Sequence, residues 1–447
     1  MYRADTVAKG FADIVRRSVD TADVRRVLVV AYYFPPMGLS GVQRTLKFVR
    51  HLPHFNWLPT VLTVDPVGYF AQDTTLLGEL SAPGITVVRT PPAGPGRFFR
   101  RKDVVRLPAE GMRKFLSRMS DTFFIPDNKI GWRRKAVRVA EELHRRKPFD
   151  LIFATAPPFT DFLIGAAIKE LINKPLVFDY RDPWVDYPFK FYPTPLHKAV
   201  TIALERKALR ASSHVVTTNR RVKELLIRRY GFLTHHDIDI IPQGFDPADF
   251  EEATPLVGPR RPADGRMRIT YAGIFWEDRI PDHFLRGLRA LFDSRPETNG
   301  RIEARFVGHF RGENLALVRA LGLTDAVTIL DYLPHRECVA ELLASDALWM
   351  IVGDDLGSPG KLYEYIGARK PILGLVPEGF IRGTIIEAGG LVVPPKDVAG
   401  ITSALSTLFD RFSGGTMPSP PHSVVEKFDR RTLTGNLVRV FESLFEP

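Results

Sequence analysis

The sequence predicts an α/β protein with two domains, each a doubly wound parallel sheet, that face each other across a cleft. Three observations support this prediction. Short β-branched runs alternate with segments of helical length along the 447 residues. The alternation forms two series, and each series opens with a hydrophobic strand that runs into a glycine-bearing loop. Between them, residues 254–265 are rich in proline, glycine and charge, as is typical of a connection between domains.

The first series begins with a strand at residues 25–31, followed by a proline- and glycine-containing loop at 32–41 and a helical pattern that continues to Val49. Strand, loop and helix in this order make the first unit of a parallel sheet. Further strands of this series are expected at residues 59–64, 85–89, 150–154, 175–179 and 214–217.

The second series begins with a strand at residues 267–273. A closing helix is expected from the helical spacing of apolar residues over 424–445. Further strands are expected at residues 304–308, 327–330, 347–352, 371–375 and 390–393. The predicted parts are an extension at 1–23, an N-terminal domain at 24–245, a linker at 246–265, a C-terminal domain at 266–420, and a segment at 421–447 that packs back on the N-terminal domain.

The composition, with 45% hydrophobic and 25% charged residues, is that of a packed globular protein. Cys338 is the only cysteine, which excludes a disulfide framework and any multi-cysteine metal site. No apolar run approaches the roughly 18 residues of a membrane span, and the first twenty residues lack the apolar core of a signal peptide. We therefore expect a cytoplasmic protein.

Much of the net charge of +11 lies in a basic segment at residues 97–147, which holds sixteen Lys or Arg and six Asp or Glu. Apolar residues are interleaved with these cations, a mixture expected of a segment that lies on an anionic membrane surface. A solvated face with its apolar residues turned inward is the alternative. Nucleic acid is not an expected partner, because no recognition-helix, zinc or RNA-binding pattern is present.

The most informative motif is GSPGKLYE at residues 357–364, where Pro359 and Gly360 lead into a helical segment that bears Lys361 and Glu364. Backbone N–H groups at a helix start bind phosphate oxygens, and Glu364, one turn later, can accept hydrogen bonds from ribose hydroxyls. The motif thus predicts a nucleotide site in the cleft, with a plain capping turn as the alternative. Neither domain has a strict G-x-G-x-x-G, which disfavours a dinucleotide dehydrogenase.

The chain from residue 24 onward resembles the GT-B glycosyltransferases of glycosyltransferase family 4. The resemblance implies two Rossmann-like domains and transfer of a sugar from a nucleotide donor with retention at the anomeric carbon. The pairing of IPDNKIGW at 125–132 with RDPW at 181–184 is similar to the subgroup that builds bacterial cell-surface polysaccharides. The main motifs are FPPMGLSG at 34–41, ATAPP at 154–158, FDYRDPW at 178–184, IPQGFD at 241–246, and the segment 359–374.

The resemblance implies donor contacts from both domains. Arg279, six residues after Gly273, stands where the family has a lysine that neutralises the diphosphate, while Ile274 replaces the usual arginine. Glu364 matches the second of two family glutamates and is expected at the ribose. Leu356 replaces the first, and Asp354 or Asp355 is a possible substitute. The expected donor-binding residues are Gly38, Gly41, Gly273, Arg279, His309, Pro359, Gly360, Lys361, Leu362 and Glu364.

The expected catalytic residues are Arg181 and Asp182, aligned where many family members have His-Asp. An arginine cannot act as a base, so Asp182 would orient or deprotonate the acceptor hydroxyl. A helix cap or a partner for Arg181 is the alternative role of Asp182, and Trp184 either stacks on a sugar or is a buried indole. The only D-x-D, at residues 237–239, is interpreted as structural, so neither a metal nor a cofactor is expected.

The predicted protein is a cytoplasmic, membrane-associated retaining glycosyltransferase with a nucleotide sugar as donor and a glycan or lipid-linked acceptor. A nucleotide-sugar epimerase of the same architecture is one alternative. A basic, non-catalytic membrane- or nucleic-acid-binding protein is the other, and a degenerate transferase without activity also stays open. The sequence does not identify the sugar, the base or the acceptor.

Overall fold

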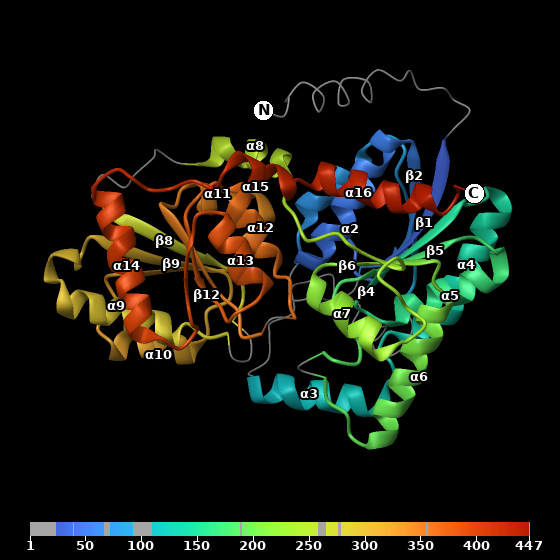
Figure 1. Cartoon of the computed structure of the whole chain (residues 1–447), viewed down its shortest axis with the longest axis horizontal. Helices are drawn as coiled ribbons and strands as arrows, with labels where there is room; N and C mark the ends of the chain where they lie inside the picture. The colour runs from blue at the N-terminus through green and yellow to red at the C-terminus, as the bar shows by residue number, and fades with distance from the viewer. Residues whose placement is uncertain are drawn as a thin grey trace.

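The computed structural model confirms the predicted fold class: two parallel-sheet α/β domains lie side by side (Figure 1). Among the described residues, no helix is both long enough and apolar enough to span a membrane. The structure describes residues 24–38, 40–66, 72–92, 110–187, 190–257, 265–275, 279–354 and 356–446. The predicted extension at 1–23 and Asp355 lie outside this range.

The N-terminal domain has a seven-stranded sheet in the order β3-β2-β1-β4-β5-β6-β7, with every neighbouring pair parallel. Its strands are β1 (Arg25–Val30), β2 (Trp57–Val64), β3 (Thr86–Thr90), β4 (Leu151–Ala156), β5 (Leu176–Tyr180), β6 (His214–Thr217) and β7 (Ile238–Ile240). Its helices are α2 (Ser40–His51), α3 (Glu110–Phe123), α4 (Arg133–Arg146), α5 (Thr160–Ile172), α6 (Pro195–Ala211) and α7 (Arg220–Arg229).

The C-terminal domain has a six-stranded parallel sheet in the order β10-β9-β8-β11-β12-β13. Its strands are β8 (Met267–Ala272), β9 (Ile302–Val307), β10 (Val327–Leu330), β11 (Ala347–Ile351), β12 (Ile372–Leu375) and β13 (Leu391–Val393). The remaining helices are α8 (Pro247–Ala253), α9 (Asp282–Ser294), α10 (Gly312–Ala320), α11 (His335–Leu343), α12 (Gly360–Gly367), α13 (Phe380–Glu387), α14 (Val398–Ser413), α15 (His422–Lys427) and α16 (Arg430–Ser443).

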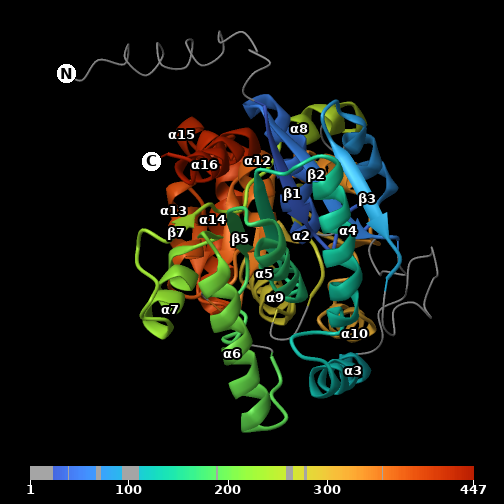
Figure 2. The same ribbon diagram turned by 90° about the vertical axis from the view of Figure 1, so that its right-hand side faces the viewer.

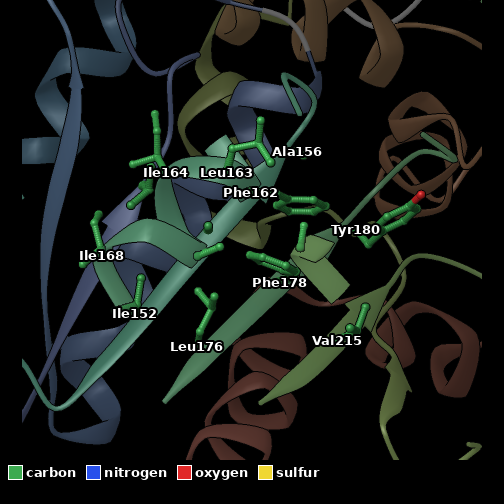
Figure 3. Packing of buried hydrophobic residues seen from close by; sticks show 14 of the residues in the cluster. Ile152, Ala156, Phe162, Leu163, Ile164, Ile168, Leu176, Phe178, Tyr180 and Val215 are labelled. Carbon is green, nitrogen blue, oxygen red and sulfur yellow. The ribbon is translucent and has the colours of Figure 1, made fainter. Parts of the chain in front are cut away.

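Helix α5 covers one face of the N-terminal sheet (Figure 3). Phe162 stacks on Phe178 of β5, with ring centroids 4.1 Å apart. Gly165 lies so close to the sheet that a Cβ there would be 3.0 Å from the side chain of Ala154. This close packing holds the carboxyl ends of β4 and β5 in fixed positions, and the loops that follow these strands carry the site.

The C-terminal segment is two helices, so the prediction of a single closing helix is wrong. Helix α15 ends at Lys427, and Asp429 caps α16 by accepting the N–H of Arg431 at 2.7 Å. Helix α16 crosses to the N-terminal domain (Figure 1), where Leu437 and Phe441 are fully buried against the sheet.

The predicted linker at 246–265 contains a packed helix. Asp246 caps α8 by accepting the N–H of Ala248 at 3.2 Å, and the apolar side of α8 joins the C-terminal domain core through Phe250 and Ala253. This helix precedes the stretch at 254–265 whose proline, glycine and charge indicated the connection between domains.

The basic segment divides into two parts in the described residues. Helix α4 buries Ala136 and Ala140 while Arg134 and Arg138 point to solvent, as the solvated-face alternative expects. Helix α3 does the opposite and leaves its apolar side chains exposed. Residues 97–109 lie outside the described residues.

Candidate active site

The candidate site lies where the strand order of each sheet reverses. In the N-terminal sheet β1 and β4 are neighbours, and in the C-terminal sheet β8 and β11 are neighbours. At such a reversal, the loops that follow the two neighbouring strands run in opposite directions and leave a crevice at the carboxyl ends of the strands. Two cavities of about 340 and 320 Å³ occupy this place between the domains, and Gly38, Arg279 and Pro359 line both.

Arg181 holds the glycine-rich loop of the N-terminal domain against the end of β4. Its Nη1 donates to the carbonyl of Gly41 at 2.6 Å, its Nη2 to that of Pro157 at 2.5 Å, and its Nε to that of Ala156 at 3.1 Å. A Cβ at Gly41 would be 2.6 Å from Nη1, so a larger residue there would displace the guanidinium from its present position. Arg181 lines the first cavity, and its contacts give it a positioning role.

Asp182 lines the same cavity and is partly buried. Burial raises the pKa of its carboxyl above the ordinary value, although the charges of Arg181 and Arg279 oppose that rise. Within the described part of the chain, the guanidinium of Arg181 hydrogen-bonds backbone carbonyls, while its charge still acts on the nearby carboxylate of Asp182. Asp182 therefore keeps its acceptor capacity for a hydroxyl in the cavity.

Trp184 does not line the cavity. Its ring is fully buried and stacks on Phe159, with centroids 4.8 Å apart, so the sugar-stacking alternative is wrong. Tyr187, three residues further, does line the cavity, and the sequence analysis missed it.

The loop after β11 positions the cation predicted for the diphosphate. Asp354 accepts the N–H groups of Leu356 and Gly357 at 3.0 and 2.9 Å, and its second oxygen is 3.3 Å from Nη2 of Arg279. Asn219 of the N-terminal domain donates to the carbonyl of Leu356 at 2.9 Å. Asp354 thus shapes the loop and orients Arg279.

Helix α12 begins at Gly360, and Pro359, Gly360 and Lys361 at its start line the second cavity. The Nζ of Lys361 lies 3.8 Å from the ring centroid of Tyr271. Burial, together with the charge of Arg279, lowers the pKa of Lys361 to about 7, although Glu364 opposes this shift.

Two glycines create the space that Lys361 occupies. Gly273 follows β8 with φ +133°, and a Cβ there would be 2.6 Å from Nζ of Lys361. Gly308 follows β9 with φ +122°, and a Cβ there would be 2.6 Å from the carbonyl oxygen of Gly273. Both positions therefore favour glycine for backbone conformation, and at Gly308 the neighbouring backbone also leaves no space for a Cβ.

Glu364 lines the second cavity and is held by His335, which the sequence analysis missed. Its Oε1 lies 3.0 Å from Nε2 of His335, while the backbone N–H of His335 donates to Asp73 of the N-terminal domain at 2.8 Å. Burial disfavours the imidazolium of His335, but the hydrogen bond to Glu364 and the charges of Asp249 and Glu364 outweigh burial and raise the pKa to about 9.

Two predicted donor-binding residues do not line either cavity. Leu362 is fully buried in the C-terminal domain core, because it lies on the inner side of α12. His309 is exposed, one residue beyond Gly308, and only Gly308 lines the cavity. A side-chain contact from either residue to a donor is not supported by this geometry.

One acidic group beside the site has the spacing of metal ligands: Glu79, Asp246 and Asp249. The Nζ of Lys47 lies among these carboxylates, 2.8 Å from Glu79 and 3.4 Å from Asp246, and it also pairs with Asp249. Lys47 therefore supplies positive charge among these carboxylates.

The D-x-D motif at residues 237–239 lies away from the site. Its residue Asp239 pairs with His214 at the β6–β7 edge of the N-terminal sheet.

Comparisons with known proteins agree with this architecture. Residues 74–249 match the model of Glycosyltransferase Family 4. The 2-deoxystreptamine glucosyltransferase of Streptomyces kanamyceticus is 25% identical over 295 residues, which are 62% of this chain and 73% of that protein.

Two solved structures with the same fold span nearly the whole chain. Sucrose-phosphate synthase from Thermosynechococcus elongatus has a TM-score of 0.65 at 16% identity and covers 94% of this chain and 99% of its own. HepE from Anabaena, in complex with UDP and glucose, has a TM-score of 0.61 at 15% identity and covers 94% and 100%. The fold is therefore GT-B.

The family match and the curated relative support a glycosyltransferase of family 4 type. The two alternatives, an epimerase and a basic non-catalytic binding protein, are not favoured.

Proposed function

We propose that this protein is a retaining glycosyltransferase that transfers a sugar from a nucleotide-activated donor to a glycan or lipid-linked acceptor in cell-surface polysaccharide synthesis. The observation that carries the proposal is that Arg279, a cation suited to a diphosphate, and the carboxylate of Asp182 line the same cavity. The UDP and glucose complex of HepE supports a nucleotide-sugar donor.

The donor is proposed to occupy the second cavity and to reach into the first. Glu364 would accept hydrogen bonds from the ribose, while the first N–H groups of α12 and the Lys361 ammonium would hold the diphosphate. The sugar would extend past Arg279 and Pro359, which line both cavities, toward Asp182.

The departing nucleoside diphosphate gains negative charge, and fixed positive groups that face it lower the barrier. Arg279, Lys361 and the α12 amides supply this charge from the protein, and we propose that no resident metal or cofactor is needed. Asp182 would orient the acceptor hydroxyl. With retention, the hydroxyl attacks on the face that the diphosphate leaves, its proton passes to the departing phosphate, and the bond between the anomeric carbon and the phosphate oxygen breaks.

A cytoplasmic location at the inner membrane surface belongs to the same proposal, because lipid-linked glycans are available there.

A transfer assay tests the proposal. Sugar nucleotides of UDP, GDP, ADP and dTDP are incubated with the protein and a bacterial glycolipid extract, and nucleoside diphosphate release and the anomeric configuration of the product are measured. Acceptor-dependent release from one donor, with the donor's configuration preserved by NMR, is expected. An inverted product would overturn retention, and turnover of the free donor to its 2-epimer would support the epimerase.

A further inference from the structure

Helix α3 turns its apolar side to solvent. The side chains of this stripe are 41% to 70% exposed and recur at helical spacing along one face: Met112, Phe115, Leu116, Met119 and Phe123. A helix of a globular domain ordinarily buries such a stripe against the core. A continuous exposed apolar patch therefore marks an interaction surface.

Polar contacts fix this orientation. Asp121 pairs with Lys190 at 2.5 Å and accepts the N–H of Phe191 at 3.4 Å. The carbonyl of Thr122 lies 3.2 Å from Nε2 of His197, and the Arg118 guanidinium lies over the ring of Phe191. These contacts anchor the C-terminal end of α3 to the protein and leave the apolar side outward.

Helix α6 extends the surface. Figures 1 and 2 show α3 beside the N-terminal end of α6, at one margin of the N-terminal domain. At this end of α6, Leu196 is 69% exposed and Val200 is also exposed. We call Met112, Phe115, Leu116, Met119, Phe123 and Leu196 the α3 surface.

The charge around the α3 surface is positive. Lys114, Arg118 and Lys198 are exposed beside it, while the nearby carboxylate of Asp121 is neutralised by Lys190. Large apolar side chains flanked by cations match an anionic lipid bilayer, whose headgroups attract the cations while its interior accepts the apolar groups.

Residues that reach the acceptor side of the cleft and residues that contact α3 are close together in the sequence. Tyr187 lines the cavity that contains Asp182, and Lys190 and Phe191 contact α3. We infer that the α3 surface docks on an anionic membrane and brings a lipid-linked acceptor to the cleft beside Asp182. The acceptor part of this inference rests on the proposed function, whereas the docking part does not.

Vesicle flotation tests the docking. The full chain is mixed with vesicles of phosphatidylcholine alone or of phosphatidylcholine and phosphatidylglycerol in equal amounts. The test variant is Phe115→Ser with Leu116→Ser. The control is Leu171→Ser with Ile386→Ser, which removes two similarly exposed apolar side chains from α5 and α13.

Wild type and control are expected to float with the phosphatidylglycerol vesicles, and less so at high salt. The test variant is expected to lose about tenfold in partitioning for each side chain removed. Wild type that fails to float at low salt would overturn the docking, as would a test variant that floats like wild type. Loss of self-association in the test variant, without any vesicle binding, would instead identify a second copy of the chain as the partner.

Nucleotide binding is measured on the same samples, so that membrane docking and the proposed function are tested independently. Vesicle binding without nucleotide binding counts against the proposed function alone. Nucleotide binding without vesicle binding counts against the α3 surface alone.

Discussion

The charge of Lys361 depends on pH more than that of the other cations at the site. Its pKa of about 7 means that the ammonium is largely deprotonated at pH 8 and protonated at pH 6. An anionic diphosphate stabilises the ammonium, so binding is expected to take up about one proton at pH 8 and almost none at pH 6. Calorimetry in buffers of different ionisation enthalpy measures this uptake.

The matched control is Lys361→Arg, which keeps a positive charge at both pH values. It is expected to bind the diphosphate without proton uptake. Equal uptake in wild type and Lys361→Arg would assign the proton to another group and contradict the role of Lys361.

Asp182→Asn separates catalysis from donor binding. The amide keeps the size of the side chain but lacks the negative charge and the second acceptor oxygen with which the carboxylate would orient the hydroxyl, so acceptor-dependent transfer is expected to fall by about a hundredfold or more. Donor affinity is expected to stay unchanged, because the proposed ribose and diphosphate contacts come from the C-terminal domain. The measurement is kcat beside the donor dissociation constant, and a parallel loss of both would count against the assignment.

At the scale of elements, His335 joins α11 to α12 through Glu364. A pKa raised from 6.5 to about 9 means that this contact stabilises the fold fully below pH 6.5 and loses its effect as pH rises through 9. His335→Asn is therefore expected to cost on the order of 2 kcal/mol at pH 6 and much less at pH 10. Urea unfolding at the two pH values measures the difference, and a cost that does not change with pH would refute the ion pair.

Helix α16 is predicted to contribute much of the stability of the N-terminal domain. Leu437 is fully buried against that sheet, so Leu437→Ala is expected to lower the free energy of unfolding by about 2–5 kcal/mol. Exposed Arg439 on the same helix provides the control, and Arg439→Ala should change stability little. Denaturant unfolding of both variants checks this, and similar small effects would mean that α16 is not part of the folded unit.

The sequence predicted the strands that are hydrophobic runs bounded by loop residues, but β7, with only three residues, was not among the predicted strands. The strand at 214–217 and that at 327–330 have the predicted bounds. The point where one helix ends and the next begins was harder to predict. The turn at Phe428 and Asp429, between α15 and α16, depends on backbone hydrogen bonds with Phe245, which is distant in the sequence.

Site residues that belong to one motif could be predicted from the sequence. Site residues that meet only because the chain folds could not. Glu364 and Lys361 follow from the helix start that carries them. His335 reaches Glu364 from another helix, and nothing local to it predicts that contact. Leu362 and His309 were placed by their neighbours in the sequence, but helix periodicity buries the first and a strand end exposes the second.

At the scale of the whole molecule, charged and polar contacts join the two domains around the cleft. Lys47 of α2 pairs with Asp249 of α8, and Asn219 at the start of α7 donates to the carbonyl of Leu356. Arg44, fully buried, binds Asp179 at 2.8 Å and the carbonyls of Ile241 and Pro242, at the chain crossing between domains. These contacts fix the relative position of the donor-side and acceptor-side loops.

The central claim is that the cleft holds a nucleotide sugar with its ribose at Glu364. The most direct measurement is calorimetric titration of wild type and Glu364→Ala with UDP, GDP, ADP and dTDP sugars, with His309→Ala as the control outside the cavities. The account predicts saturable binding of one nucleotide class, at least about tenfold weaker in Glu364→Ala and unchanged in His309→Ala. Absence of binding by all four classes, or binding that Glu364→Ala leaves intact, would contradict it.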